Sequence, residues 1–305
     1  MRAYLLLQQM LVLFAMMITG FWAYRMKWID RQGGNKLTTL IVKLFNPMLI
    51  LSSVLGDRPA NAGNLLGQDL LLASLYFIFI ILGSHLFCKI RRYDRRSGNI
   101  YILLTTFGNL GFMGIPIVRA VYGPEYIIYV VIYLLIFNIL AYTYGIWLAM
   151  GMSPNKRSFS PVLMVNSGLV ICVIAVICFL ARVKFPAPVV SFCTYMGDCA
   201  IPLSMIVIGI SLAQSNLKEL LFDKDTYIFL FFRMLLLPAA GILIFRLLPF
   251  HKDVYVIFTL MISMPAATIG GMLAQEFAGR GNEASKIILL STVISVFSIP
   301  LLSLL

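Results

Sequence analysis

The sequence contains few charged residues for its length. Only 12% of its 305 residues are Asp, Glu, Lys or Arg, whereas 61% are hydrophobic. Because a water-soluble domain is about a quarter charged and about half apolar, this composition excludes an ordinary soluble protein. The charges cluster between apolar runs of about 20 residues, the length that crosses a ~30 Å hydrocarbon core as a helix. The sequence therefore predicts an all-α transmembrane protein.

Residues that carry enzymatic or metal chemistry are also scarce. The two histidines, His85 and His251, are far apart and form no HExxH motif, and the five cysteines form no CxxC pair. The sequence has no P-loop, and Asp198 lacks a second mid-span carboxylate with which to form a protease dyad. We therefore expect no zinc site, no disulfide, no cofactor and no enzymatic activity.

The apolar runs predict ten spans in two halves. In chain order the spans cover residues 4–24, 36–55, 69–89, 98–122, 126–150, 161–182, 190–213, 226–248, 254–278 and 285–304. The polar segment 151–160 is predicted to be a cytoplasmic linker. It separates residues 1–150, with spans 1–5, from residues 161–305, with spans 6–10.

The basic residues indicate how the chain is oriented. The chain has 24 basic and 12 acidic residues, and the basic residues lie mostly between apolar runs, which favours a role in orientation over nucleic-acid binding. The segments after odd-numbered spans hold fifteen of them, namely Arg25, Lys27, Arg31, Lys36, Lys89, Arg91, Arg92, Arg95, Arg96, Lys156, Arg157, Lys218, Lys224, Arg280 and Lys286. The opposite side holds seven, namely Arg2, Arg58, Arg119, Arg182, Lys184, Arg246 and Lys252. This asymmetry predicts cytoplasmic odd-numbered loops and both termini outside.

Paired prolines indicate that the two halves are related. Pro47 in span 2 matches Pro202 in span 7, and Pro116 in span 4 matches Pro265 in span 9. Five spans per half is an odd number, so two similar halves have opposite orientations in the membrane. Interruptions at equivalent positions are typical of transporters built from inverted repeats, although single prolines are ordinary in membrane helices.

Span 4 is the most informative stretch for function. Gly108, Gly111, Gly114 and Pro116 lie within nine residues, which disfavours a continuous helix. A helix broken at membrane depth exposes backbone N–H groups that attract an anion, and Asn109 adds an amide beside the break. Span 9 repeats the pattern with Pro265, beside Ala266. The alternative interpretation is a small-residue face for helix packing.

Other polar residues inside apolar runs have two interpretations each. Lys43 and Asp198 lie near the prolines of spans 2 and 7, so they could form a structural ion pair or a group that changes protonation. We expect Arg233, near the start of span 8, to extend its charge to the interface. Asn138 in span 5 is a candidate ligand or an interhelical hydrogen-bonding residue.

Five segments together resemble the auxin efflux carrier family, which is distantly similar to bile acid–sodium symporters. They are FNPMLILSSV, TTFGNLGFMGIPIVRAVYG, GDCAIPLSMIVIGISLA, MPAATIGGMLAQEFAGRGNEAS and STVISVFSIPLL. The resemblance implies ten helices in two inverted five-helix repeats, with helices 4 and 9 broken and crossing. It also implies a scaffold domain from spans 1, 2, 6 and 7 and a transport domain from spans 3–5 and 8–10 that moves like an elevator.

The resemblance also implies residue roles. Asn109 matches the asparagine that contacts the substrate carboxylate, Pro116 and Pro265 match the crossover prolines, and Asn138 matches a polar residue facing the site. Lys43 resembles a scaffold lysine of plant members. Gly108 stands where plant carriers have proline, and segment 151–160 is much shorter than their cytoplasmic loop, so auxin itself is not the expected substrate.

The leading hypothesis is a transporter that exports small carboxylates across the plasma membrane, which is the inner membrane in a bacterium. By analogy we expect a homodimer through the scaffold domain, and coupling to H⁺ or Na⁺ stays open. One alternative is a sodium-coupled importer of bile-acid-like amphiphiles, and another is a non-transporting membrane sensor or scaffold.

Overall fold

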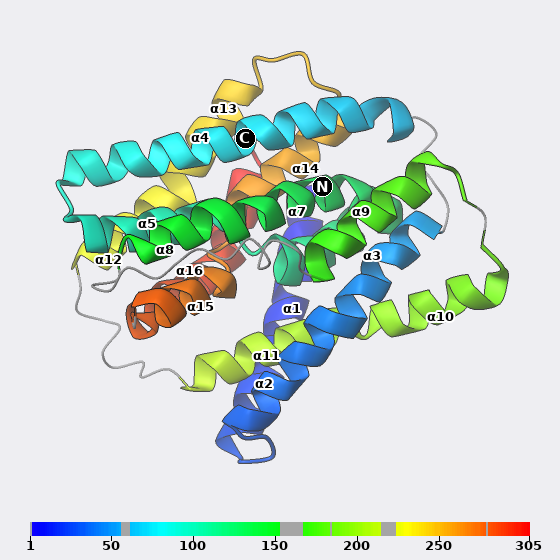
Figure 1. Cartoon of the computed structure of the whole chain (residues 1–305), viewed down its shortest axis with the longest axis horizontal. Helices are drawn as coiled ribbons and strands as arrows, with labels where there is room; N and C mark the ends of the chain where they lie inside the picture. Colours follow the sequence, from blue (N-terminus) through cyan, green and yellow to red (C-terminus); the bar gives the residue numbers. More distant parts are fainter. Residues whose placement is uncertain (1, 56–61, 153–166, 184, 215–223, 279) are drawn as a thin grey trace.

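The computed structural model describes residues 2–55, 62–152, 167–183, 185–214, 224–278 and 280–305 (Figure 1). The described part of the chain is helical and forms no β-strand. Most of the predicted linker 151–160 and the start of span 6 lie outside the described residues.

The helices of the first half are bounded as follows: α1 (Arg2–Arg25), α2 (Arg31–Leu40), the π-helix η1 (Ile41–Phe45), α3 (Asn46–Leu55), α4 (Ala62–Arg91), α5 (Arg95–Thr106), the π-helix η2 (Leu110–Gly114), α6 (Ile115–Tyr122), the 3₁₀-helix η3 (Pro124–Tyr126), α7 (Ile127–Leu140), the π-helix η4 (Ala141–Gly145) and α8 (Ile146–Met150). Those of the second half are α9 (Ser167–Leu180), α10 (Ala187–Asp198), α11 (Ala200–Gln214), α12 (Lys224–Phe231), the π-helix η7 (Phe232–Leu236), α13 (Leu237–Phe245), α14 (Lys252–Ser263), α15 (Thr268–Ala278) and α16 (Gly281–Leu302).

Among the described residues, seven helical runs are long and apolar enough to cross a membrane. They are Tyr4–Arg25, Arg31–Leu55, Leu65–Arg91, Pro124–Met150, Ala187–Gln214, Lys224–Phe245 and Glu283–Leu302. The other three predicted spans are not single long helices in the described residues. Spans 4 and 9 are each divided into shorter helices, and span 6 contributes the shorter apolar helix Gly168–Leu180.

Three of the π-helical turns precede a proline at the same offset. The turns η1, η2 and η7 end two residues before Pro47, Pro116 and Pro238, respectively. Proline lacks an N–H group and its ring crowds the carbonyl one turn back, so the helix widens there rather than closing an ordinary α-turn. The sequence thus places the local irregularities of the bundle.

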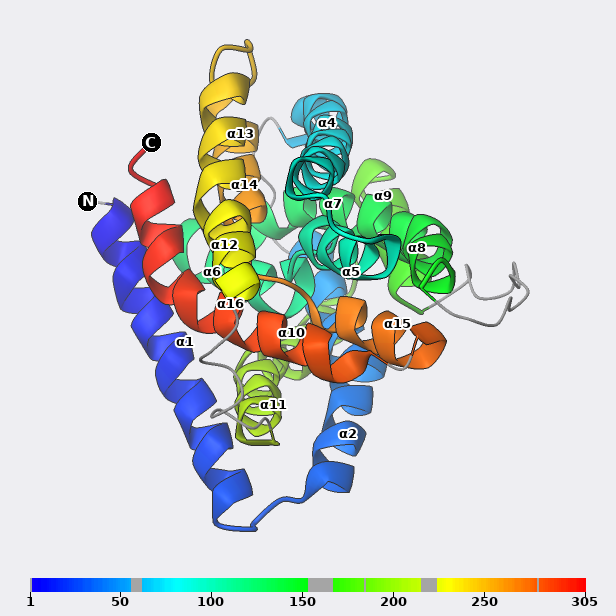
Figure 2. The same cartoon turned by 90° about the vertical axis from the view of Figure 1, so that its left-hand side faces the viewer.

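Close helix packing joins the first and second halves of the chain. Helix α1 runs along α11, and a Cβ atom added at Gly20 or Gly209 would overlap the backbone of the other helix, at Ile206 or Met17. Figure 2 shows α1 beside α16, and α16 beside α15. Small residues that let helix backbones touch are typical of membrane bundles.

Large apolar side chains remain exposed around this bundle. Along α4, for example, Leu82, Leu86 and Ile90 are 64%, 58% and 70% exposed. A contiguous apolar exterior on a helical bundle is compatible with lipid rather than water.

Candidate functional site

The interruptions of spans 4 and 9 lie against each other at the centre of the molecule. Helix α5 ends at Thr106 and α14 ends at Ser263, and the extended residues that follow form an antiparallel bridge between Gly108 and Ala266. The Asn109 N–H donates to the Pro265 carbonyl oxygen at 2.7 Å, and the Ala267 N–H donates to the Phe107 carbonyl oxygen at 2.8 Å. Because these backbone groups satisfy one another, non-helical chain is tolerated inside the bundle.

The bridge is also held from its two sides by side chains. The Ala266 N–H donates to the Ser291 hydroxyl of α16 at 3.2 Å. The Arg233 guanidinium of η7 donates to the Met264 carbonyl oxygen at 3.0 Å and to the Ile262 carbonyl oxygen at 3.5 Å. These carbonyls lie at the C-terminal end of α14, where a positive charge is favourable.

Arg233 is therefore a central residue rather than a peripheral one. Its side chain is fully buried, so the prediction that it extends to the membrane interface is wrong. A Cβ atom at Gly108 would lie 3.3 Å from an Arg233 guanidinium nitrogen, which places the positive charge directly behind the crossover bridge. The carbonyl oxygens of the interrupted helix, rather than water, solvate the charge.

A cavity of about 720 Å³ extends to the crossover between two pairs of helices. Asn109 lies at its inner end, and its walls come from α2, α11, α15 and α16. The lining residues are Arg31, Asn35, Asn109, Ile208, Ser211, Leu212, Gln214, Thr268, Gly271, Met272, Gln275, Gly281, Ser285, Lys286, Ile288, Leu289 and Thr292. Within the described residues this lining contains two basic side chains and no acidic one.

The cavity contains an arrangement of backbone dipoles suited to an anion. Helix α15 begins at Thr268, a lining residue, immediately after the crossover bridge. The first amides of a helix have no acceptor within that helix and carry the positive end of its dipole. Together with the side-chain amide of Asn109, the N-terminal end of α15 adds positive potential to a cavity whose charged lining residues, Arg31 and Lys286, are basic.

Comparison with family models gives a match over nearly the whole chain. A family described as a membrane transport protein matches residues 5–158 and 146–303. The chain belongs to this family, the auxin efflux carriers. It is therefore a multi-pass membrane transporter, and the family is a transporter family rather than an enzyme family. Comparison with curated proteins finds no match to the chain.

The site residues predicted for this carrier occupy three kinds of position. Asn109 lines the cavity, whereas Gly108, Pro265 and Ala266 form the backbone bridge behind it. Pro116 is buried in α6 and Gly111 lies in η2. The side chain of Asn138 in α7 donates to the Leu134 carbonyl oxygen of its own helix at 2.7 Å. Pro116, Gly111 and Asn138 do not line this cavity.

Lys43 and Asp198 do not form an ion pair with each other. Asp198 pairs with Arg119 of α6, and its side chain is 49% exposed. Lys43 lies in η1 with an exposed side chain. Of the two interpretations considered for these residues, the structural ion pair is absent from the described residues, and Asp198 instead links α10 to α6.

A buried carboxylate that the sequence analysis did not consider lies in α4. Asp69 is fully buried, and neither of its carboxylate oxygens has a hydrogen-bond partner in the described part of the chain. The sequence does contain a signal for it, because Asp69 falls at helical spacing between Leu66 and Ala73 on the buried stripe of α4. Asp69 is also the first residue of the predicted span 3, residues 69–89.

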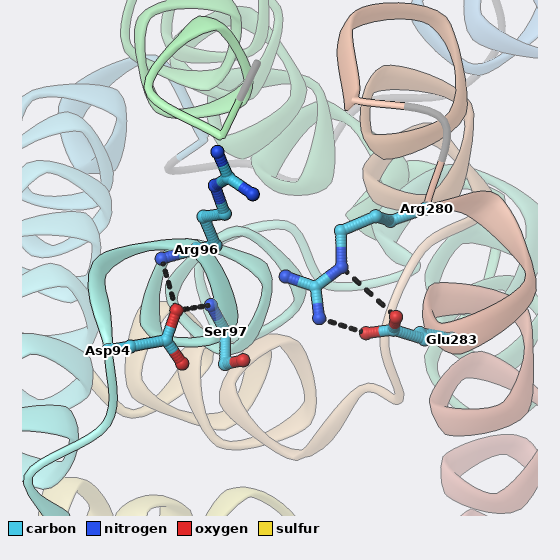
Figure 3. Close-up of polar contacts among 5 residues, drawn as sticks. All are labelled: Asp94, Arg96, Ser97, Arg280 and Glu283. Atoms are coloured by element: carbon cyan, nitrogen blue, oxygen red, sulfur yellow. Dashed lines mark hydrogen bonds and ion pairs between the residues drawn. The ribbon is translucent and has the colours of Figure 1, made fainter. Parts of the chain in front are cut away.

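The loops before α5 and α16 each hold a local polar contact made by a charged residue (Figure 3). The Asp94 carboxylate caps α5 by accepting from the N–H groups of Arg96 at 3.0 Å and Ser97 at 3.3 Å. Arg280, which precedes α16, pairs with Glu283 through two hydrogen bonds of 3.0 and 2.6 Å. Hydrogen bonds from Ser97, and more weakly the Arg96 amide and the Arg280 charge, hold the pKa of Asp94 below its ordinary value.

An Asp94→Ala change is expected to destabilise the protein modestly and in a pH-dependent way. Loss of an N-cap typically costs about 1 kcal/mol, so the thermal unfolding midpoint in detergent falls at neutral pH. Because the folded-state pKa of Asp94 is lowered, its stabilising effect is full above the unfolded-state pKa of about 3.9 and is lost as pH falls through the folded-state pKa. Unfolding midpoints of both proteins, measured from neutral to acidic pH, should converge at the acidic end. A difference that grows on acidification would contradict this role.

Proposed function

We propose that this carrier is a secondary or potential-driven transporter of small organic-acid anions, and that it exports carboxylates. The observation that supports this most directly is the cavity, whose charged lining residues, among those described, are Arg31 and Lys286. A carboxylate in this cavity would accept hydrogen bonds from the side-chain amide of Asn109 and from backbone N–H groups at the start of α15. Such a set of donors favours anions by both charge and geometry.

The position of the cavity supports an elevator-type mechanism. Helices α2 and α11 belong to the expected scaffold domain, whereas α15 and α16 belong to the expected transport domain. A substrate held at the crossover would touch both domains, so sliding of one against the other would expose it to alternate sides. Alternating access of this kind is typical of inverted-repeat transporters.

The packing of the helices supports two inverted repeats of five spans. Helix α1 packs on α11 and α16, and α9 packs on α3 and α7. In the ten-span numbering, span 1 therefore contacts spans 7 and 10, and span 6 contacts spans 2 and 5. Exchanging the two halves converts the first set of contacts into the second.

The distribution of basic residues supports an orientation with both termini outside the plasma membrane. In that orientation the cavity opens towards the cytoplasm, because Arg31 and Lys286 lie at the ends of odd-numbered loops. An anion leaving a cell that is negative inside gains about 2.3 kcal/mol per charge per 100 mV. Export down this potential needs no coupling ion.

Binding and flux measurements on an Asn109→Ala variant test the proposal. Acetate, lactate, malonate, succinate and benzoate are screened for thermal stabilisation of detergent-purified protein, and the strongest stabiliser is then used in everted vesicles. We expect the wild-type protein to be stabilised and to take up the acid, which corresponds to export in the cell. Removing the Asn109 amide should abolish both effects while leaving the unfolding midpoint of the free protein nearly unchanged.

A matched control is Asn46→Ala, which removes the same amide from α3 outside the cavity. It should keep wild-type uptake. Full uptake by the Asn109→Ala variant would refute the site. Stabilisation that requires sodium would favour an importer of bile-acid-like amphiphiles, and stabilisation by none of the acids would favour a sensor.

A further inference from the structure

Asp69 lies in an apolar environment near the N-terminal end of α4. It occupies the buried stripe of the helix, which also contains Leu72, Ala73 and Tyr76. Both carboxylate oxygens are buried without a hydrogen-bond partner, and no ion pair joins Asp69 to a basic residue within the described part of the chain. An isolated carboxylate ion in such a place costs several kcal/mol, so a bound cation or proton must neutralise it.

Side chains that interact electrostatically with Asp69 favour a proton over a metal cation. The neighbouring helix α7 presents the hydroxyls of Tyr129 and Tyr133, which interact electrostatically with Asp69. Both hydroxyls are buried and without a partner among the described residues. The described residues contain no cluster of three or more acidic, histidine or cysteine side chains that could hold a metal ion. One carboxylate and neutral hydroxyls are too few ligands for a hard cation, which takes six or more oxygens.

The remaining charged and titratable groups lie at the edges of this region. The chain before α7 carries Glu125 and Tyr126, and the start of α14 carries His251, Lys252 and Asp253. The His251 N–H donates to the Gln68 side chain at 3.0 Å, and the side chains of His251 and Asp253 are 45% and 39% exposed. At the end of α13, Arg246 donates to the Leu305 carbonyl oxygen at 2.5 Å. On α5 the charged residues Arg95 and Arg96 lie at the start of the helix, next to the far end of α4.

The buried residues Tyr133, Tyr76 and Arg233 pack between the Asp69 region and the crossover without hydrogen bonds joining them to Asp69. Tyr133 packs edge-on against Tyr76, with 5.5 Å between ring centroids, and Tyr76 lies two helical turns beyond Asp69, about 10 Å along α4. A Cβ atom at Gly108 would lie 3.5 Å from the Tyr76 hydroxyl and 3.3 Å from the Arg233 guanidinium. Asp69 and the substrate site therefore lie at opposite ends of one low-dielectric region, where charges interact over long distances.

We propose that Asp69 is a proton-binding site and that its protonation is linked to carboxylate binding at the crossover. This inference rests on the proposed function of the cavity. An anion beside Asn109 repels a negative charge on Asp69, so it favours the protonated form. By thermodynamic linkage, protonation of Asp69 strengthens anion binding by the same factor. The proton and the carboxylate then bind together, and the charge carried across the membrane is reduced.

The pH dependence of binding tests this linkage. Lactate and benzoate are used as probes because both acids, with ordinary pKa values near 4, stay anionic between about pH 5.5 and 8.5. We expect the wild-type dissociation constant to fall by at least about fivefold as pH falls across this range, which is the low end of typical coupling between two sites. The Asp69→Asn variant resembles the protonated form, so it should bind at every pH with the affinity that the wild type has at low pH.

Two control variants separate Asp69 from other titrating groups. Asp253→Asn removes an exposed carboxylate whose charge acts on Tyr129, and Asp198→Asn removes the one paired with Arg119. Both should keep the pH dependence of the wild type. A wild-type affinity that does not change with pH, or an Asp69→Asn variant that still follows pH, would overturn the proposal. An affinity that follows sodium concentration at fixed pH would instead assign the site to a cation.

Infrared spectroscopy of the free protein provides a second measurement that needs no ligand. At neutral pH the wild type should show the carbonyl stretch of a protonated carboxylic acid, shifted in deuterated buffer, and Asp69→Asn should lack it. Absence of that band from the wild type would refute the assignment even if the variant does not fold. If neither probe binds at any pH but the band is present, the proposed function fails while the proton site stands.

Discussion

Replacing Arg233 with methionine is expected to lower the thermal unfolding midpoint sharply and to weaken carboxylate binding. The guanidinium satisfies the Ile262 and Met264 carbonyl oxygens at the end of α14, and methionine fills similar space without a donor. Each buried acceptor left without a partner costs about 1–3 kcal/mol, so loss of both partners is expected to cost about 2–6 kcal/mol in total. The loss of the positive charge behind Gly108 should also reduce affinity for an anion at Asn109.

Thermal unfolding curves in detergent measure the loss of stability, and lactate titrations of the same samples measure the loss of affinity. Arg91→Met is the matched control, because Arg91 forms an ion pair with Asp225 in which both side chains are more than a third exposed. Exposed pairs contribute at most about 1 kcal/mol, so this variant should resemble the wild type. If Arg233→Met and Arg91→Met unfolded at the same temperature, Arg233 would not hold the crossover.

A Gly209→Leu change is expected to separate the helices α1 and α11. A side chain at this position would overlap the Met17 carbonyl oxygen, and the backbone of α1 offers no flexible group that can move aside. Overpacking of a tight contact costs about 1–3 kcal/mol or more. We therefore expect a lower unfolding midpoint and a smaller monodisperse fraction in size-exclusion chromatography.

Gly67→Leu controls for the loss of glycine and the gain of an apolar side chain in a helix. Gly67 lies in α4, and a Cβ atom built there meets no other atom within 4 Å. This variant should match or slightly exceed the stability of the wild type, since leucine favours helix more than glycine does. If both substitutions lowered the unfolding midpoint equally, the close contact of α1 with α11 would contribute little to stability.

The sequence carries enough information for seven of the ten predicted spans, which form long apolar helices, and for the interruptions of spans 4 and 9. The spans follow from long apolar runs, the break in span 9 falls at Pro265, and the break in span 4 falls at the start of the stretch that contains Gly108, Gly111, Gly114 and Pro116. The same logic accounts for the π-helical turns before Pro47 and Pro238, which the sequence analysis did not anticipate. The distance between the two interruptions could not be predicted from local sequence, because the bridge between Gly108 and Ala266 joins residues from different halves of the chain.

The charged residues were harder to place from sequence. Arg233 looked peripheral because a long side chain near a span end usually reaches water, yet the carbonyls of α14 solvate its charge inside the protein. Asp198 looked central because it lies beside Pro202, yet it pairs with Arg119 at a half-exposed position. Burial of a charged residue depends on which helices surround it. Periodicity along one helix indicates only which side of that helix the residue occupies, as for Asp69 on the buried stripe of α4.

The joint between spans 4 and 9 consists of main-chain hydrogen bonds, in which the backbone N–H groups of Asn109 and Ala267 donate to the carbonyl oxygens of Pro265 and Phe107. Such bonds do not depend on which side chains are present, apart from the close fit at Gly108. Substrate selectivity and the backbone connection between spans 4 and 9 therefore depend on different residues. Ser285 and Thr292 line the cavity from α16. They can be substituted to change substrate selectivity while the main-chain bridge between Gly108 and Ala266 stays intact.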